Sequence, residues 1–309
     1  MTTWDFPCSE PVDISVDSWL SGSIAISGEP TTSILVEVLP TFDSRGAEEL
    51  LQELQVSFDD GRLYVRGPRY ASHRRKTSLD LIIKTPAGSA CTAKTASADV
   101  ACIGELGELT VQTASGDVTA DVVSGDVTIH SASGDVLLNG ARGDVTINTA
   151  SGDIQANKVE GDLRVNTASG DVAVGYCSGS VSSHTASGDV GLGCVVSGQV
   201  DLVSVSGDLE VAVVPGIGVY LDLASTSGDV RSDLAASDGD AAAANVSIKC
   251  RTLSGDIRIG RSRQTAGSGA AAQEPVTPEP APETPAPALA ADAAPTAEAA
   301  DAEAAEPNE

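Results

Sequence analysis

Aromatic residues are scarce in this sequence: Phe, Trp and Tyr together make up 3% of its 309 residues. A large aromatic core is therefore excluded, and a narrow core of Val, Ile, Leu and Ala is expected instead. Long apolar runs are also missing, since no stretch approaches the roughly 18 residues that a membrane-spanning helix needs. The sequence therefore predicts no membrane span.

The first ten residues lack the features of a secretory signal. They hold acids and a proline, but neither a basic segment nor an apolar run. We therefore expect a cytoplasmic protein.

Positive charge is in short supply. The chain has 18 Lys and Arg residues against 44 Asp and Glu residues, which gives a formal net charge of −26. Such a balance disfavours non-specific binding of the whole protein to nucleic acid or to an anionic membrane. Nucleic acid is therefore not an expected partner.

Motifs for metal binding and catalysis are missing too. None of the six cysteines forms a CxxC pair, and none clusters with the three histidines. No isolated acid–base pair, Ser-His-Asp order or phosphate-binding glycine loop stands out. The sequence predicts no enzyme, no cofactor, and no catalytic, cofactor-binding or metal-binding residues. The cysteines and histidines are Cys8, Cys91, Cys102, Cys177, Cys194, Cys250, His73, His130 and His184.

What the sequence does contain is a nine-residue repeat built on Ser-Gly-Asp-Val. A fixed short period indicates a repeat architecture. Glu108, Ser180 and Gln199 stand where Asp is missing, and one residue is inserted before Gln199. The repeating aspartates are Asp99, Asp117, Asp126, Asp135, Asp144, Asp153, Asp162, Asp171, Asp189 and Asp208.

Each repeat predicts one strand and one turn. Counted from Asp as position zero, positions one and three are apolar and position two is mostly polar, as in a strand with one buried face. Position six holds Val, Ala or Cys and is expected to face the same core. The glycine at position eight suits a tight corner.

A second period of 18 residues lies on the first. Thr-Ala-Ser-Gly-Asp begins at residues 113, 149, 167 and 185, and the units between have other sequences. Two nonapeptides therefore form one coil with two chemically distinct faces, and each strand is expected to pair in parallel with the strand 18 residues on. The predicted fold class is all-β, a parallel β-solenoid.

Two further regions flank the solenoid, which is predicted for residues 81–263. Residues 1–80 do not follow the repeat. Their alternating segments, a hairpin signal at Asp59-Asp60-Gly61 and a helical stretch at 47–54 predict a small β-rich N-terminal cap with one short helix. Residues 264–309 are rich in Pro, Ala and Glu without Lys or Arg, and predict a disordered tail that acts as a spacer or binds a partner.

These segments resemble a bacterial family of β-strand-repeat proteins known as "putative adhesins", built around a domain of unknown function. The resemblance covers most of residues 10–260. It includes the Asp-Gly-Arg-Leu-Tyr-Val hairpin near residue 60, the Leu-Asp-Leu-Ile-Ile-Lys-Thr-Pro segment at 79–86 and the closing Thr-Leu-Ser-Gly-Asp-Ile-Arg-Ile. It implies a β-repeat fold and no catalytic residues.

The aspartate ladder is the sharpest candidate site. In-register stacking would place the carboxylates about 4.8 Å apart, where two charges repel by roughly 0.9 kcal/mol in water. Hydrogen bonds from turn N–H groups and from the Ser hydroxyl are the structural explanation. Calcium binding is the alternative, although the repeat lacks the longer glycine turn of calcium-binding nonapeptides.

Two smaller features also allow two interpretations. Cysteines at inward positions, Cys91, Cys102, Cys177 and Cys250, are expected to be small buried hydrophobic groups, and a Cys177–Cys194 disulfide is the alternative. A basic cluster is either a solvated hairpin edge or a dock for the acidic tail or an anionic partner. Its members are Arg62, Arg66, Arg69, His73, Arg74, Arg75 and Lys76.

The sequence favours a non-enzymatic, adhesin-like scaffold or interaction protein with an unidentified protein or polysaccharide partner. Exposed strand edges at the ends of the solenoid allow self-association, so a self-assembling cytoplasmic scaffold is one alternative. A sensor or regulatory module for an envelope component or a peptide is another. A carbohydrate-active β-helix enzyme is the third. His130 and His184 are expected to be exposed members of a polar ladder.

Overall fold

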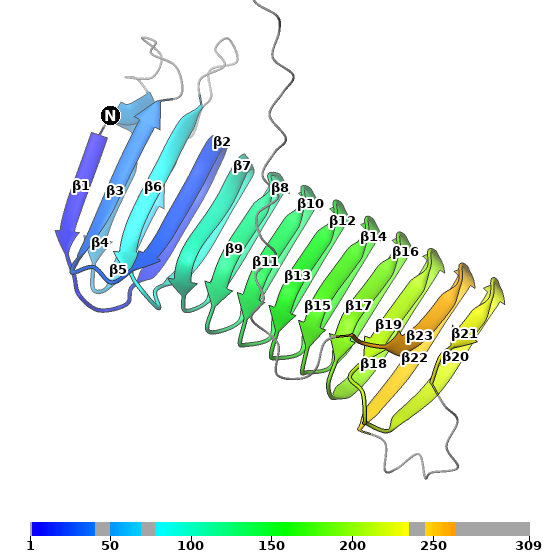
Figure 1. Cartoon of the computed structure of the whole chain (residues 1–309). Coiled ribbons are helices and arrows are strands. Elements are labelled where there is room, and N and C mark those ends of the chain that lie inside the picture. The colour runs from blue at the N-terminus through cyan, green and yellow to red at the C-terminus, as the bar shows by residue number, and fades with distance from the viewer. Residues whose placement is uncertain (1, 41–49, 69–77, 235–244, 264–309) are drawn as a thin grey trace, which may run out of the picture. The chain divides into compact units, whose positions relative to one another are not determined.

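The computed structural model describes residues 2–40, 50–68, 78–234 and 245–263. The described strands belong to one compact unit, which spans residues 1–269. They form a stack of parallel coils, so the predicted β-solenoid is confirmed (Figure 1). The predicted tail at 264–309 lies outside the described residues, and the predicted domain boundary at residue 80 stays a prediction.

Each central coil has one strand in each of two sheets, face A and face B. Strand β7 (Ala90–Leu106) bends through both sheets and begins the regular part of the stack. Face A continues with β8 (Leu109–Ser115), β10 (Val127–Ser133), β12 (Val145–Ser151), β14 (Leu163–Ser169), β16 (Val181–Ser187) and β18 (Gly198–Ser206). Face B continues with β9 (Val118–Val123), β11 (Val136–Ala141), β13 (Ile154–Val159), β15 (Val172–Cys177), β17 (Val190–Val195) and β19 (Leu209–Val213).

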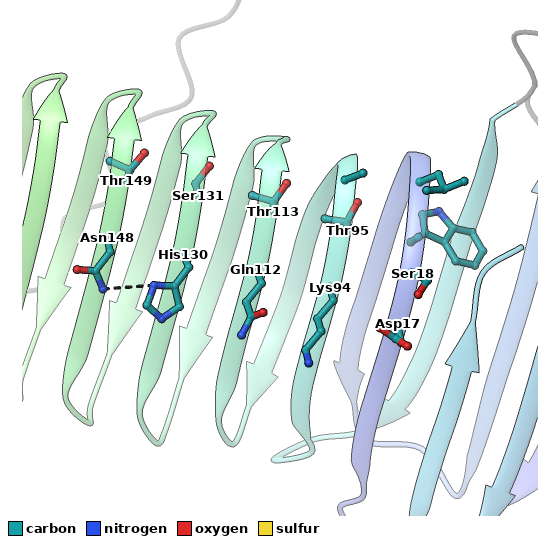
Figure 2. A pocket seen from close by; sticks show the side chains of 13 residues that line it. Asp17, Ser18, Lys94, Thr95, Gln112, Thr113, His130, Ser131, Asn148 and Thr149 are labelled. Carbon is teal, nitrogen blue, oxygen red and sulfur yellow. Dashed lines mark hydrogen bonds between the residues drawn. The ribbon is translucent and has the colours of Figure 1, made fainter. Parts of the chain in front are cut away.

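The predicted pairing of strands 18 residues apart is confirmed along this central part. Val127 on β10 lies opposite Val145 on β12, and Val136 on β11 lies opposite Ile154 on β13. In-register pairing stacks like side chains in rows along the solenoid, as the outward side chains of face A do (Figure 2). Similar chemistry is therefore repeated at the strand spacing of about 4.8 Å.

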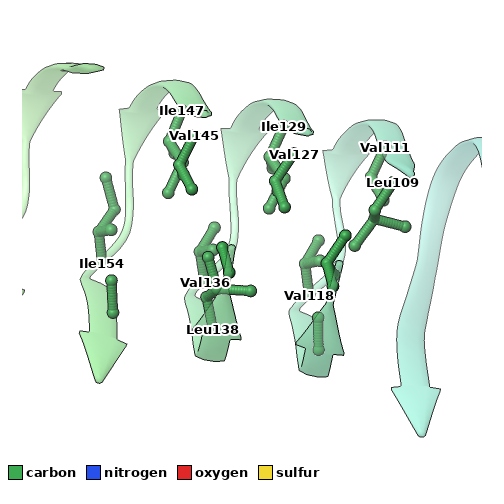
Figure 3. Close-up of a cluster of buried hydrophobic side chains, with 14 of the residues drawn as sticks. Leu109, Val111, Val118, Val127, Ile129, Val136, Leu138, Val145, Ile147 and Ile154 are labelled. Carbon is green, nitrogen blue, oxygen red and sulfur yellow. The ribbon is translucent and has the colours of Figure 1, made fainter. Parts of the chain in front are cut away.

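The core is narrow and aliphatic, as predicted. The side chains at positions one and three of both sheets meet between them, and Val127, Ile129 and Leu138 are each at most 1% exposed (Figure 3). Strands with branched side chains on one face pack well against a facing sheet, because the side chains alternate in direction along each strand.

The prediction for position six is wrong in face A. Val123, Ala141 and Val159 in face B are buried there, but Ala132 and Ala150 in face A are exposed. Face A strands alternate through position five, which therefore points inward, and positions six and seven are both exposed. In face B strands the alternation breaks after position three, and position six rather than position five points inward. The Thr-Ala-Ser-Gly-Asp units therefore bury Thr rather than Ala.

The N-terminal region contributes a solenoid coil of its own, which differs from the sequence-based expectation. Strand β2 (Asp13–Glu29) pairs in parallel and in register with β7, so that Ile14 lies opposite Cys91 and Ile24 opposite Val100. On its other side, β2 pairs in parallel with β5 (Arg62–Arg66) and β6 (Leu79–Pro86). The coil formed first in the chain thus lies between two coils that come later.

Antiparallel strands cover this end, as expected for a cap. Strand β3 (Ser33–Pro40) pairs with β6, β1 (Thr2–Pro7) pairs with β3, and β4 (Gln55–Asp59) pairs with β5. The predicted β4–β5 hairpin turns at Asp60 and Gly61, which both have positive φ, as a tight hairpin turn requires. Residues 50–53 are helical, whereas the start of the predicted helix lies outside the described residues.

The C-terminal coils are out of sequence order, which corrects the expected pairing. Strands β22 (Val246–Ser254) and β23 (Ile257–Arg261) lie between the β18/β19 coil and the coil formed by β20 (Val219–Ser227) and β21 (Val230–Ser232). Val246, Ile248 and Ile257 are fully buried, whereas Tyr220 and Val230 are 43% and 46% exposed. Ile259 on the inner coil stands opposite Ser232 on the outer one, so the inner unit has the more continuous apolar pattern.

Candidate functional site

One surface of the solenoid is free of acidic residues. It consists of residues 90–97 of β7 with β8, β10, β12, β14 and β16, and we name it the acid-free face. These segments contain no Asp or Glu, although the chain has 44 acids. Face B differs, because it carries Glu105 and Asp121. The local charge of the acid-free face is therefore opposite in sign to that of the whole protein.

A groove of about 830 Å³ lies at one end of this face (Figure 2). It crosses β2, β7, β8, β10 and β12, so that its length follows the stacking direction. Its floor consists of side chains from two adjacent positions of each strand. The groove is lined by Asp17, Ser18, Trp19, Leu20, Lys94, Thr95, Ala96, Gln112, Thr113, His130, Ser131, Asn148 and Thr149.

A polar ladder runs along the middle of the groove. Lys94, Gln112, His130 and Asn148 are consecutive partners in register, and the row continues beyond the groove with Asn166 and His184. Both histidines are exposed, which confirms their predicted place in a polar ladder.

The far part of the ladder is bonded to itself. The Asn148 amide lies 3.4 Å from His130 Nδ1, and Asn166 Nδ2 donates to Asn148 Oδ1 at 2.8 Å. Within the described part of the chain, Lys94 and Gln112 make no such side-chain bond. The free donors and acceptors of the ladder are therefore concentrated near β7 and β8.

A row of hydroxyl groups runs beside the ladder. Thr149, Thr167 and Thr185 each donate to the carbonyl of the serine two residues on, at 2.9 to 3.1 Å. Thr113 lines the groove and is only 8% exposed, yet its Oγ1 has no hydrogen-bond partner among the described residues. A buried hydroxyl without a partner is costly, so Thr113 is the least satisfied group of the groove.

The β2 end of the groove has a fixed shape. The register between β2 and β7 shifts between Val16 and Trp19, where Ser18 has a φ of 60°. The Trp19 indole is 1% exposed and donates to the Leu79 carbonyl at 3.1 Å. This ring therefore cannot stack on a ligand.

The charges in and beside the acid-free face divide into paired and unpaired groups. Asp17 bonds to Arg66 at 3.2 Å, with Arg66 lying over the Tyr64 ring. Lys94 in the groove and the exposed Arg164 on β14 form no ion pair with any described residue. The face therefore carries two uncompensated positive charges.

The aspartate ladder has a structural role that joins one coil to the next. The Oδ1 of each Asp accepts the backbone N–H of the residue one coil on, as Asp153 does from Asp171 at 2.9 Å and Asp189 from Asp208 at 2.7 Å. The second ladder does the same, with Ser180 N–H donating to Asp162 at 2.8 Å. The ladder carboxylates thus accept backbone N–H groups, as expected, but these come from the neighbouring coil rather than from the same turn, and no Ser hydroxyl of the described residues donates to them.

The glycine before each Asp lets the coils approach. Gly152 has a φ of 121°, and a Cβ there would clash with the Gly134 carbonyl oxygen. No group of three or more His, Cys, Asp or Glu side chains that could hold a metal ion occurs among the described residues. One oxygen of each ladder carboxylate in the central coils is thus committed to the backbone.

Only part of the predicted basic cluster lies within the structure. Arg62 pairs with Asp13 at 3.5 Å, and Arg66 pairs with Asp17, so both are neutralised by β2. The remaining members, Arg69, His73, Arg74, Arg75 and Lys76, lie outside the described residues.

The cysteines are buried thiols, as the sequence favours. All six are free and five are buried, while Cys8 is half-buried. The register partner of Cys177 is Val195, so the Cys177–Cys194 disulfide is not formed. Burial raises the pKa of the Cys177 thiol to about 11 and that of the Cys250 thiol to about 12. Both thiols therefore stay protonated and unreactive near neutral pH.

Sequence reasoning placed the histidines on an exposed ladder but did not single out Lys94, Gln112 or Thr113. A count of acids on alternate repeats would have found the acid-free face, because the signal is an absence along one set of strands.

The described part of the chain contains no helix that is both long enough and apolar enough to span a membrane.

The chain is similar to several solved structures. No curated protein matches the chain. A "putative adhesin" from Bacteroides fragilis NCTC 9343 is 12% identical with a TM-score of 0.41, and the match covers 84% of this chain and 96% of that one. A "putative lipid binding protein" from Parabacteroides distasonis ATCC 8503 is 18% identical with a TM-score of 0.40, with 84% and 96% covered. A "putative adhesin" from Parabacteroides merdae ATCC 43184 is 11% identical with a TM-score of 0.39, with 84% and 95% covered.

Such low identities and TM-scores support no functional argument. The family model is more informative, because the Toastrack DUF4097 model matches residues 45–213, which is more than half of the chain. The chain belongs to the Toastrack DUF4097 family.

Proposed function

We propose that the protein is a non-enzymatic, adhesin-like interaction protein that holds its partner on the acid-free face. The observation that carries the proposal is the groove along Lys94, Gln112, His130 and Asn148, which combines the unpaired polar groups of Lys94 and Gln112 with the adjoining acid-free face. The rows repeat at the strand spacing of about 4.8 Å, so they suit an extended partner with repeating groups.

A sensor or regulatory module for an envelope component or a peptide would use the same face. It differs from an adhesin-like protein in the response that binding triggers rather than in the surface used.

The cytoplasmic location stays a prediction. Fractionation of cells with an antibody to the protein tests it, and recovery in an envelope fraction would overturn it.

The experiment for the proposed function compares two faces of the same solenoid. Immobilised protein is exposed to separated protein, polysaccharide and lipid fractions of a bacterial envelope. A triple variant, Gln112→Ala, His130→Ala and Asn148→Ala, removes the ladder from the groove. The matched control, Asn139→Ala and Asn157→Ala, removes an exposed amide ladder from face B, whose side chains bond at 2.9 Å.

The wild type and the face B control should retain at least one fraction that the triple variant loses. Circular dichroism of all three proteins checks that the fold is unchanged. Equal retention by the two variants, or no retention by the wild type, would contradict the proposal.

Self-assembly is a second candidate function, which the C-terminal coil favours. Tyr220 and Val230 are 43% and 46% exposed on the outermost coil, and exposed strand edges promote pairing with another chain. Size-exclusion chromatography with light scattering tests it. Concentration-dependent dimers or polymers that Tyr220→Lys abolishes would support it, and a monomer at all concentrations would exclude it.

A further inference from the structure

We infer that the ligand of the acid-free face is an acidic polysaccharide, a linear chain of hydroxyl-rich units that carries carboxylates at intervals. This inference rests on the proposed function, since it names the chemical class of partner that the same face would hold. It concerns the binding chemistry of the face and does not depend on the compartment.

The geometry first favours a linear polymer over a compact ligand. The groove extends along the stacking direction, and its rows continue in register past Asn148 to Asn166 and His184. From Lys94 on β7 to Arg164 on β14 there are four strand steps, or about 19 Å at the usual strand spacing. A chain of repeating units can contact equivalent groups at each step, whereas a small molecule would use only one or two.

The free groups next favour a partner rich in hydroxyls. Gln112 offers an amide that both donates and accepts, and the Thr113 hydroxyl beside it is buried and has no hydrogen-bond partner among the described residues. Sugar hydroxyls match such groups, because each hydroxyl also donates and accepts.

The charges then favour a partner with sparse negative charge. Lys94 and Arg164 have no ion-pair partner among the described residues, and the face around them carries no acid. A carboxylate placed against either side chain would form a charge-assisted hydrogen bond. Asp17 of β2 lines the same groove, but it is paired with Arg66 at 3.2 Å. The fields of more distant acids are screened beyond about 8 Å at physiological salt.

The same observations argue against a peptide and against a nucleic acid. A peptide adds to a sheet through an exposed strand edge, but every strand in the groove from β7 to β12 is paired on both sides. Single-stranded nucleic acid needs exposed aromatic rings for base stacking and a dense row of basic residues for its phosphates. Trp19 is buried, and the two free cations are far apart.

The test uses a polymer pair that differs only in charge. Polygalacturonate oligomers and their methyl-esterified counterparts share one backbone, and only the former carry free carboxylates. Binding to the full-length protein is measured by calorimetry at moderate and at high salt. We expect the acidic oligomers to bind, the esterified ones to bind at least about tenfold more weakly, and added salt to weaken binding.

Two variants locate the contact. Lys94→Gln should weaken binding of the acidic oligomers by about tenfold and bring it close to that of the esterified ones. Lys158→Gln is the matched control on face B, where Lys158 pairs with Glu160 at 2.7 Å and lowers the pKa of that carboxyl. This control should bind as the wild type does. Lys94 is exposed and Lys158 is partly exposed, and thermal unfolding verifies that both variants fold.

Other outcomes would overturn the inference. Equal binding of charged and esterified oligomers would remove the role of the carboxylate, and equal losses in the two Lys variants would remove the groove. Tighter binding of polyuridylate than of the acidic oligomers would indicate a nucleic acid, and preference for dextran sulfate would indicate sulfate groups. A last result is that the acidic oligomers do not bind, although the Gln112, His130 and Asn148 triple variant still loses an envelope fraction that the wild type retains. That result would support the proposed function and exclude only this class of ligand.

Discussion

The two ends of the solenoid solve the same problem in different ways. At each end, a coil is inserted between neighbours that are not adjacent to it in sequence: β2 lies between β6 and β7, and β22 lies between β18 and β20. At the N-terminal end, antiparallel strands β1 and β3 then cover the stack. At the C-terminal end, the outermost coil leaves Tyr220 and Val230 exposed.

This difference shows that the position of a coil in the stack does not follow from its position in the chain. All coils share one register, so the pairing geometry accepts any of them at any level. Packing decides, because a coil with two neighbours buries both of its edges. The coil containing Ile14 and Ile24 and the coil containing Ile248 and Ile257 have strong apolar patterns and take inner places.

Cross-linking gives the largest expected effect, because its outcome is all or none. Val203 on β18 lies opposite Arg251 on β22, and Arg251 lies opposite Ala224 on β20. Neighbouring strands lie about 4.8 Å apart, which suits a disulfide, whereas next-nearest strands are too far apart for one. Val203→Cys with Arg251→Cys should therefore cross-link on mild oxidation, and Val203→Cys with Ala224→Cys should not. Peptide mass spectrometry identifies the bond, and the reverse result would mean that the coils stack in sequence order.

Removal of buried side chains should separate the ends by stability. Ile26 in β2 is fully buried, so Ile26→Ala should cost about 3 kcal/mol of unfolding free energy. Leu221 on the outermost coil is only half-buried, and Leu221→Ala should cost less than about 1.5 kcal/mol. Urea unfolding measures both, and hydrogen exchange should show β20 opening before β2. Equal costs at the two sites would mean that the C-terminal end is covered as well as the N-terminal one.

The repeat predicted the interior of the solenoid well, because each nonapeptide specifies its own strand and corner. Val127 opposite Val145 follows from the 18-residue period alone. The ends could not be predicted, because insertion of β2 and β22 depends on competition between coils for burial, which no local pattern records. Likewise, Ala150 and Ala141 occupy the same repeat position, and only the packed sheets distinguish the exposed one from the buried one.

The aspartate ladder offers a smaller test of the same comparison. The Asp153 carboxylate accepts the Asp171 N–H, whereas the Asp229 carboxylate accepts no backbone N–H from the described residues and pairs with Arg231 on the exposed surface. Asp153→Ala should cost about 1 kcal/mol, the usual value of one hydrogen bond. Asp229→Ala should cost about 0.3 kcal/mol, at the low end of what exposed ion pairs contribute. Chemical denaturation measures both.

The control for this test is Asp153→Asn. An amide oxygen can accept the same hydrogen bond, and removal of one charge from the ladder relieves repulsion between carboxylates. The Asn variant should therefore be at least as stable as the wild type. A loss as large as that of Asp153→Ala would mean that the charge itself is needed, which would point to a bound cation.

The addition of calcium should have the smallest effect on stability, and its result compares the interior of the aspartate ladder with its end. In the interior, one oxygen of each carboxylate is held by the next coil, as Asp135 is by the Asp153 N–H at 2.9 Å. We therefore expect no calcium to bind there. Because a ligand raises stability only by binding the folded state, by RT ln(1 + [L]/Kd), the thermal unfolding midpoint should be the same in millimolar calcium and in chelator. A rise of the midpoint with calcium that Asp153→Asn abolishes but Asp229→Asn does not would show that neighbouring interior carboxylates bridge an ion through their second oxygens. That result would turn the ladder from a device that joins coils into a cation site, and would do so only where the ladder is continuous on both sides.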